Sequence, residues 1–155
     1  MKFFFCLSII IFYYIHFSEN STCSIIDSLK GTWMNELGSK MIIHSINIDE
    51  REKHYNNTFN GIYESAVGDA KGYYPLYGTF NYNNCSTSIG FNVIYSNYKI
   101  DSGSNAVWSG QIRCEKNQLI IPTTWLLNIY NQNKWDSTMI GQNIFKKERG
   151  AVCYF

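Results

Sequence analysis

The chain has 155 residues, with 13 lysines and arginines against 12 aspartates and glutamates, so its formal net charge is +1. Hydrophobic residues make up 45% of the chain, aromatic residues 17% and charged residues only 16%. A nucleic-acid-binding surface needs clustered lysine and arginine, and the basic cluster at residues 146–149 is too short to line a groove, so no nucleic-acid partner is expected. At this length we expect one domain with a hydrophobic core.

Residues 1–22 have the layout of a secretory signal peptide. Lys2 precedes an apolar run over residues 3–15, and a polar stretch follows at 18–22. A membrane anchor is the alternative, but the run is shorter than the roughly 18 residues that a span needs. We therefore expect cleavage between Ser18 and Cys23, and a secreted domain over residues 23–155 that ends in a short C-terminal tail. No second apolar stretch of span length follows, so no membrane partner is expected.

Cleavage would remove Cys6 and leave an even number of cysteines. The four are Cys23, Cys85, Cys114 and Cys153. In an oxidising compartment they predict two disulfides, with three possible pairings. A zinc site is the alternative, but the chain has no C-x-x-C and the mature part keeps only His44 and His54, so no metal is expected. Glycosylation sequons begin at Asn20, Asn56 and Asn84.

Apolar and polar residues alternate with a period of two along the mature chain, as they do in strands with one buried face. Alternating segments lie at 33–39, 59–67, 91–95, 108–112, 121–127 and 139–145, and turn-rich segments lie at 49–57, 68–72, 81–88, 97–105, 115–117 and 128–133. Over the whole mature chain we estimate roughly eight strands, which predicts an all-β, antiparallel up-and-down barrel that holds one small ligand. A sandwich also fits the spacing. Gly31-x-Trp33 at the first strand, and Pro122 near a strand start, favour the barrel.

Several polar residues occupy the same alternating positions as the apolar residues and are therefore expected to face inward with them. They are Asn35, Ser39, Tyr63, Ser65 and Asn143. A buried polar group is costly without a partner, so the set predicts a compact polar ligand end surrounded by aromatic walls. For any one of these residues, pairing with another of them or a place at the barrel mouth is the favoured explanation. For the set as a whole, a ligand is favoured.

The segments Asn35-Glu36-Leu37-Gly38-Ser39, 61–68 (GIYESAVG), 108–111 (WSGQ), 124–127 (TWLL) and 140–145 (IGQNIF) closely resemble the avidin/streptavidin family, in the family's order. The resemblance covers residues 28–146. It implies an eight-stranded barrel that binds biotin non-covalently as a ligand, with no catalytic residue and no cofactor. It also implies a homo-oligomer, with a tetramer favoured.

The resemblance implies a role for each residue of the site. Asn35, Ser39 and Tyr63 would donate to the ureido oxygen of biotin, and Ser65 and Asn143 would accept its two N–H groups. The apolar walls would be Leu37, Val67, Trp108, Trp125 and Leu127. The tail carboxylate would meet Gly68, Asp69 and Ser104, and Trp135 would be lent by a neighbouring subunit. A local role of Trp135 in anchoring its own loop is the alternative.

Three positions depart from the family pattern. Asp69 replaces an amide and places a carboxylate near the ligand's own. Tyr95 replaces a tryptophan, and Ala106 replaces a threonine hydroxyl. Each change should cost about 1 kcal/mol, so we expect binding that is weaker than in the best family members. By resemblance to the avidin bridge, we expect the disulfides Cys23–Cys114 and Cys85–Cys153.

Other functions fit less well. The hydrolase, zinc-protease, P-loop and dinucleotide motifs are missing from the sequence, and His44 and His54 have the surroundings of solvated surface groups, so no enzyme is expected. A lipocalin-like carrier of apolar ligands would explain Gly31-x-Trp33 but not the polar set. An avidin-shaped interaction module that has lost its ligand is the remaining alternative, and biotin–agarose retention would separate the three.

Overall fold

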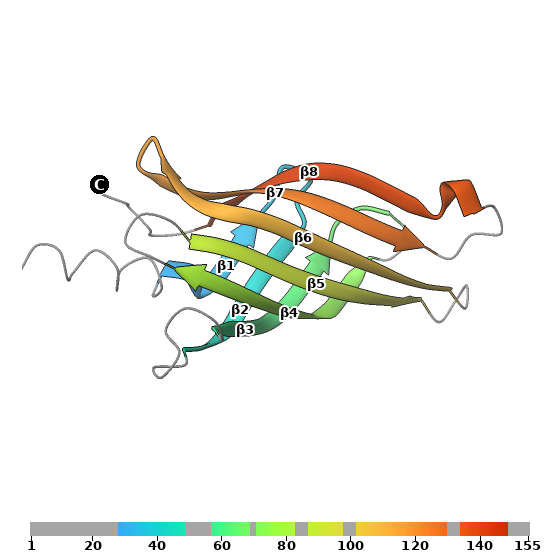
Figure 1. The fold of residues 1–155 in the computed structure, drawn as a ribbon, viewed down its shortest axis with the longest axis horizontal. Coiled ribbons are helices and arrows are strands. Elements are labelled where there is room, and N and C mark those ends of the chain that lie inside the picture. The colour runs from blue at the N-terminus through green and yellow to red at the C-terminus, as the bar shows by residue number, and fades with distance from the viewer. Residues whose placement is uncertain are drawn as a thin grey trace, which may run out of the picture.

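A computed structural model describes residues 28–48, 57–68, 71–82, 87–97, 102–129 and 134–148. The strands are β1 Gly31–Met34, β2 Lys40–Asn47, β3 Thr58–Ser65, β4 Gly72–Tyr82, β5 Thr87–Asn97, β6 Ser102–Glu115, β7 Gln118–Ile129 and β8 Thr138–Lys147, with a short 3-10 helix η1 at Lys134–Asp136. Each strand pairs antiparallel with the next one along the chain (Figure 1). Residues 1–27, which include the expected signal peptide, lie outside the described residues.

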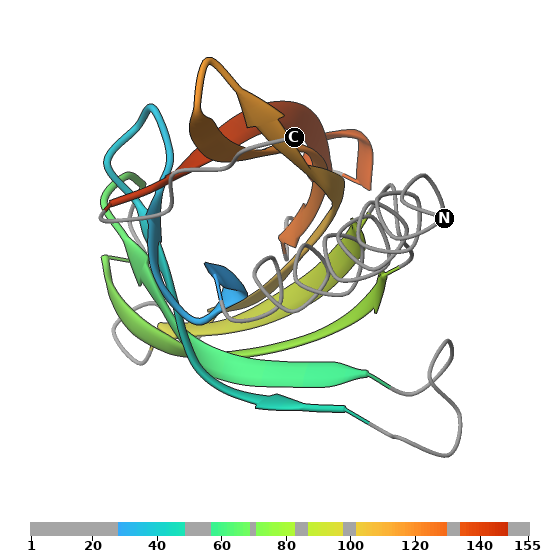
Figure 2. The same cartoon turned by 90° about the vertical axis from the view of Figure 1, so that its left-hand side faces the viewer.

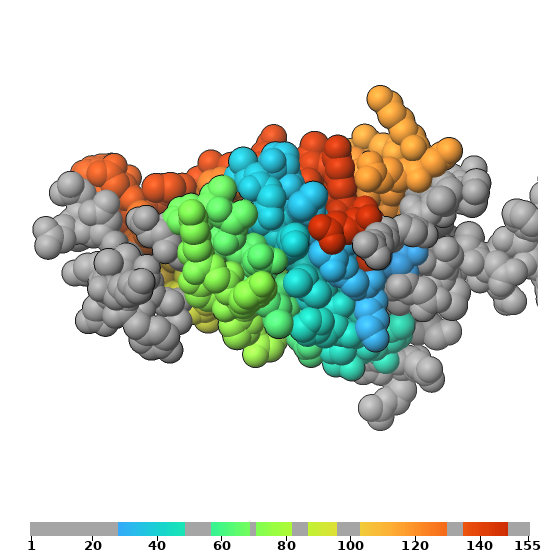
Figure 3. Space-filling model, turned by 180° about the vertical axis from the view of Figure 1, so that it is seen from behind, coloured from blue at the N-terminus to red at the C-terminus, as the bar shows by residue number. Residues whose placement is uncertain are grey.

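The sheet closes on itself into a barrel. β8 pairs with β1 through Trp33↔Lys147 and Met34↔Lys146, and the Glu148 N–H donates to the Thr32 carbonyl at 3.0 Å beside them. Viewed along the barrel the strands form a ring (Figure 2), and from behind the two terminal strands lie side by side (Figure 3). The eight-stranded up-and-down barrel is therefore confirmed, and the sandwich is wrong.

Side chains alternate across the barrel wall because successive strand residues face opposite sides. In β5, Ile89, Phe91, Val93 and Tyr95 are buried, whereas Ile94 is 64% exposed. The buried residues form one cluster inside the barrel. At its closed end Trp33 is fully buried, and its Nε1–H donates to the Leu29 carbonyl at 2.8 Å. Trp33 of Gly31-x-Trp33 is therefore part of the buried core inside the barrel.

The largest differences from the expected boundaries lie at residues 33–39 and 97–105. The alternation over 33–39 does not continue as strand, since β1 ends at Met34 and a turn follows. Asn35 Oδ1 accepts the N–H of Leu37 and of Ser39, and Gly38 takes a φ of +84° that suits glycine. The expected turn at 97–105 is also too long, because β6 already begins at Ser102.

Pro122 lies inside β7, and its effect on the sheet is local. The β6–β7 pairing runs to Gly110↔Thr123 and resumes at Arg113↔Ile120 in the same register. The interruption coincides with Pro122, which has no N–H to donate. The strand tolerates proline here because it still pairs with β8, where Pro122 lies opposite Ile144.

Candidate functional site

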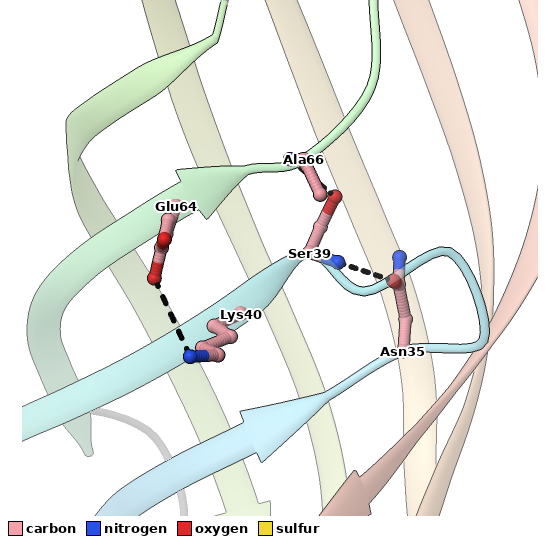
Figure 4. A network of polar contacts seen from close by, with 5 residues as sticks. All are labelled: Asn35, Ser39, Lys40, Glu64 and Ala66. Carbon is pink, nitrogen blue, oxygen red and sulfur yellow. Dashed lines mark hydrogen bonds and ion pairs between the residues drawn. The ribbon is translucent and has the colours of Figure 1, made fainter.

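The turn between β1 and β2 presents the first polar group of the site. Asn35 is 5% exposed, and its Oδ1 accepts the Ser39 N–H at 2.9 Å (Figure 4). The same oxygen accepts the Leu37 N–H at 3.1 Å. Because the oxygen is engaged by the turn, the Nδ2 end of the amide is the end that can donate to a ligand. The turn therefore sets Asn35 as a donor.

Two hydroxyl groups, those of Ser39 and Tyr63, lie beside Asn35. Ser39 is 1% exposed, and its Oγ accepts the Ala66 N–H at 3.1 Å (Figure 4). Its side chain also hydrogen-bonds to Tyr63. Burial raises the pKa of the Tyr63 phenol, and the charge of Glu36 adds to this, against the opposing hydrogen bond from Ser39. The phenol therefore keeps its proton and remains a donor at neutral pH.

Asn143 on β8 lies next to the same turn. It is 5% exposed, and its Oδ1 accepts from Trp108 Nε1 at 3.4 Å. Its Nδ2 donates to Glu36 Oε1 at 2.8 Å, and the second carboxylate oxygen, Oε2, accepts the Ile144 N–H at 2.9 Å. Burial raises the pKa of Glu36, but these two hydrogen bonds, with the charge of Lys146, outweigh it and hold the pKa below its usual 4.5.

Aromatic rings line the interior next to these polar groups. Trp108 stacks on Phe91 with ring centroids 4.9 Å apart and lies 5.1 Å from the Tyr63 ring. Tyr95 meets Tyr63 edge-on at 6.3 Å and Tyr74 at 4.8 Å. Burial, followed by the two neighbouring phenols, raises the pKa of Tyr95, so it also stays neutral.

Trp125 on β7 lies across a glycine of the neighbouring strand. It pairs with Gly141, where a Cβ would come within 2.3 Å of the Trp125 ring. Real Cβ contacts of that length do not occur, so glycine at this position makes room for the indole. Ala106 and Leu127 are opposite each other on β6 and β7 and continue the same wall.

The other expected site residues lie nearer the mouth. Leu37 is 53% exposed and Val67 46% exposed, so neither is buried among the chain's own residues. Ser65 is half-buried, and its hydroxyl donates to the Val67 carbonyl at 3.0 Å, which leaves its oxygen able to accept. Gly68 follows this segment and is exposed, and Ser104 is half-buried opposite Tyr95.

Some expectations cannot be placed. Asp69 and three of the four disulfide cysteines, Cys23, Cys85 and Cys153, lie outside the described residues, so which cysteine pairs with which stays a prediction. Cys114 is half-buried in β6. Among the residues that the structure describes, no group of three or more His, Cys, Asp or Glu side chains is placed to hold a metal ion. In that same part of the chain, no helix is long and apolar enough to cross a membrane.

The sequence did not single out three residues of this region. Glu36 lies in a turn, and nothing in its neighbourhood along the chain indicates the contact with β8. Tyr74 and Phe91 join the aromatic wall through ring contacts, and Phe91 was expected only as an inward strand residue.

The sequence model of the Avidin family matches residues 24–148. The chain belongs to the avidin family. Avidin of Gallus gallus is 34% identical over 131 residues, and Avidin-related protein 1 of the same species is 33% identical over 129, each match covering 79% of both chains.

Solved avidin-family structures agree with this barrel. AVR2 aligns with a TM-score of 0.65 at 28% identity, over 79% of this chain and 97% of its own. Xenavidin aligns with a TM-score of 0.63 at 30% identity, over 77% of this chain and 96% of its own. The family expected from the sequence is therefore confirmed.

Proposed function

We propose that this avidin-family chain is a secreted, non-enzymatic protein that binds biotin non-covalently inside its barrel. The observation that supports this most strongly is the buried cluster of Asn35, Ser39 and Tyr63 beside Trp108. Three donors close together suit one oxygen that carries partial negative charge, as the ureido oxygen of biotin does. Because the turn and strands hold these groups in place, little ordering entropy opposes binding.

The rest of the ligand follows from the same arrangement. The Oδ1 of Asn143 and the Oγ of Ser65 would accept the two ureido N–H groups. Trp108, Trp125 and Leu127 would pack against the ring system, with Leu37 and Val67 covering it from the exposed turns, and Tyr95 and Ala106 would complete the wall. The tail carboxylate would reach Gly68, Asp69 and Ser104 at the mouth.

We further propose that the protein works as a homo-oligomer, with a tetramer favoured, in which Trp135 completes a neighbouring site. Trp135 is 96% exposed in η1, so it does not pack as an anchor on its own chain. The outer faces of β4, β5 and β8 also carry exposed apolar residues: Tyr73, Tyr77, Ile94 and Ile140. Secretion, the two disulfides and glycosylation at the sequons belong to the same proposal.

The test uses a substitution that preserves the hydrogen bonds of the turn and replaces the Asn35 donor with an acceptor. Asn35→Asp retains an oxygen for the N–H groups of Leu37 and Ser39, but it replaces the Nδ2 donor with a second acceptor. We expect the parent protein to be retained on biotin–agarose and released by free biotin. For Asn35→Asp we expect a loss of affinity of about 100-fold, as for a hydrogen bond replaced by a repelling charge.

Asn60→Asp is the matched control, because Asn60 is exposed on β3 and its substitution should leave binding unchanged. A parent protein that calorimetry shows to be indifferent to biotin would contradict the proposal. A co-purified lipid would then indicate the carrier function, and an empty barrel would indicate the interaction module.

A further inference from the structure

Glu36 connects the first turn of the barrel to its last strand. Its Oε1 accepts from Asn143 Nδ2 at 2.8 Å, and its Oε2 accepts the Ile144 N–H at 2.9 Å. The first contact joins residues 107 positions apart in the sequence. Both are charge-assisted hydrogen bonds, which are stronger than neutral ones.

The carboxylate determines which way the Asn143 amide faces. An ionised carboxylate can only accept, so the NH₂ group of Asn143 must point to Glu36. The carbonyl Oδ1 then points the other way, where Trp108 Nε1–H, which can only donate, lies 3.4 Å away. The two ends of the amide thus lie between an obligate acceptor and an obligate donor, and these agree on one orientation.

We propose that Glu36 is a specificity-determining positioning residue, which holds Asn143 as a hydrogen-bond acceptor toward the ligand. This inference rests on the proposed function. On this side the pocket then accepts a ligand N–H and rejects an oxygen or other acceptor at the same place. The charged and titratable groups that face Glu36 are Lys146 on β8 and Tyr63 on β3.

Glu36→Gln removes the constraint with little change in shape. A glutamine that still accepts the Ile144 N–H must turn its NH₂ toward Asn143. Asn143 then turns its carbonyl toward residue 36, and its own NH₂ faces the ligand. A variant that only loosens the mouth would weaken all ligands alike, whereas a reversed amide changes which ligand is preferred.

The experiment measures dissociation constants for biotin and for its two cyclic carbamate analogues, in which one or the other ureido N–H is replaced by a ring oxygen. We expect the parent to prefer biotin over each analogue by about tenfold or more. In Glu36→Gln, the preference against the analogue altered on the Asn143 side should fall by about tenfold. The preference against the analogue altered on the Ser65 side should stay unchanged and serves as the internal control.

Two further variants complete the design. Asn143→Asp should bind poorly, because its carboxylate would face that of Glu36. Combining it with Glu36→Gln should restore binding, since the glutamine NH₂ then donates to the new carboxylate while its oxygen keeps the Ile144 N–H. Glu115→Gln, which removes an exposed carboxylate at the β6–β7 turn, should match the parent in every measurement.

The proposal would be overturned if Glu36→Gln lost affinity equally for all three ligands. It would also be overturned if the double variant bound biotin no better than the combined losses of the two single variants predict. A measurement made without ligand distinguishes a failure of the positioning role of Glu36 from a failure of the proposed function. The side-chain NH₂ resonances of Asn143, identified by their disappearance in Asn143→Asp, should shift in Glu36→Gln and titrate in the parent with a midpoint below 4.5. Should the parent fail to bind biotin, unchanged resonances would overturn the positioning role as well, and shifted ones would support it.

Discussion

Tyr95 is a residue of the proposed pocket at which the sequence departs from the family pattern. It is 8% exposed, and its ring meets those of Tyr63 and Tyr74 edge-on. Its phenol offers less apolar area than the indole that the family pattern has there, and it brings a hydroxyl that needs a partner. The aromatic wall is therefore complete but less apolar.

Tyr95→Trp should strengthen biotin binding about fivefold, because a larger apolar ring replaces a buried hydroxyl. Competition calorimetry or the dissociation rate of labelled biotin would measure the change. Tyr73→Trp is the control, since Tyr73 is 69% exposed on the neighbouring strand. Equal affinities of Tyr95→Trp and the parent would show that the smaller ring costs nothing.

At the scale of elements, the closed end joins β1 to β8. Lys147 Nζ lies 4.8 Å from the centre of the Trp33 ring and donates to the Lys30 carbonyl. Only two residues of β1 pair with β8 in the described part of the structure. The side-chain contacts of Lys147 therefore supplement a short run of backbone pairing between the two strands. Burial lowers the pKa of Lys147 from 10.5 to about 8.

The lowered pKa predicts a pH dependence of stability. Between about pH 8 and about pH 10 the unfolded chain keeps the Lys147 proton and the folded chain releases it, so the free energy of unfolding should rise with pH across this interval. Urea titrations at several pH values would measure the rise, and Lys147→Met should abolish it. In the control Lys71→Met, which removes an exposed lysine, the rise in the free energy of unfolding should remain. If the rise also persists in Lys147→Met, it originates from another group.

At the scale of the whole molecule, one exposed tryptophan supports the proposed oligomer. Trp135 is 96% exposed, and burying an indole contributes more than burying any smaller side chain. A shallow groove of about 780 Å³ also crosses the outer wall, with the exposed Ser88, Ser109, Thr124 and Gln142 in its lining. Both features lie where a second copy could contact the barrel from outside.

Mixed oligomers test whether Trp135 acts between subunits. Trp135→Ala should release biotin about tenfold faster, from lost apolar contact, while the thermal stability of the ligand-free protein stays unchanged. Asn35→Asp subunits have a disabled pocket but an intact Trp135. Co-expression of the two variants should therefore restore slowly dissociating sites, and a failure to restore them would place Trp135 in its own chain's loop.

Much of the fold could be predicted because strand alternation is a local pattern. Ile89 to Tyr95 alternate in the sequence, and they alternate in burial. The same parity placed Asn35, Ser39, Tyr63 and Asn143 among buried residues, as the structure has them. The strand expected over residues 33–39 is shorter in the structure, because the Asn35 side chain accepts two backbone N–H groups and β1 ends at Met34.

By itself, then, the sequence determined the barrel and the chemical kinds of group inside it, because which face a strand residue takes depends on its immediate neighbours. Only the tertiary structure decided how those groups are oriented. The turn makes Asn35 a donor, and Glu36 and Trp108 together make Asn143 an acceptor. The two contacts that orient Asn143 join residues 35 and 107 positions apart in the chain, where no local pattern records them.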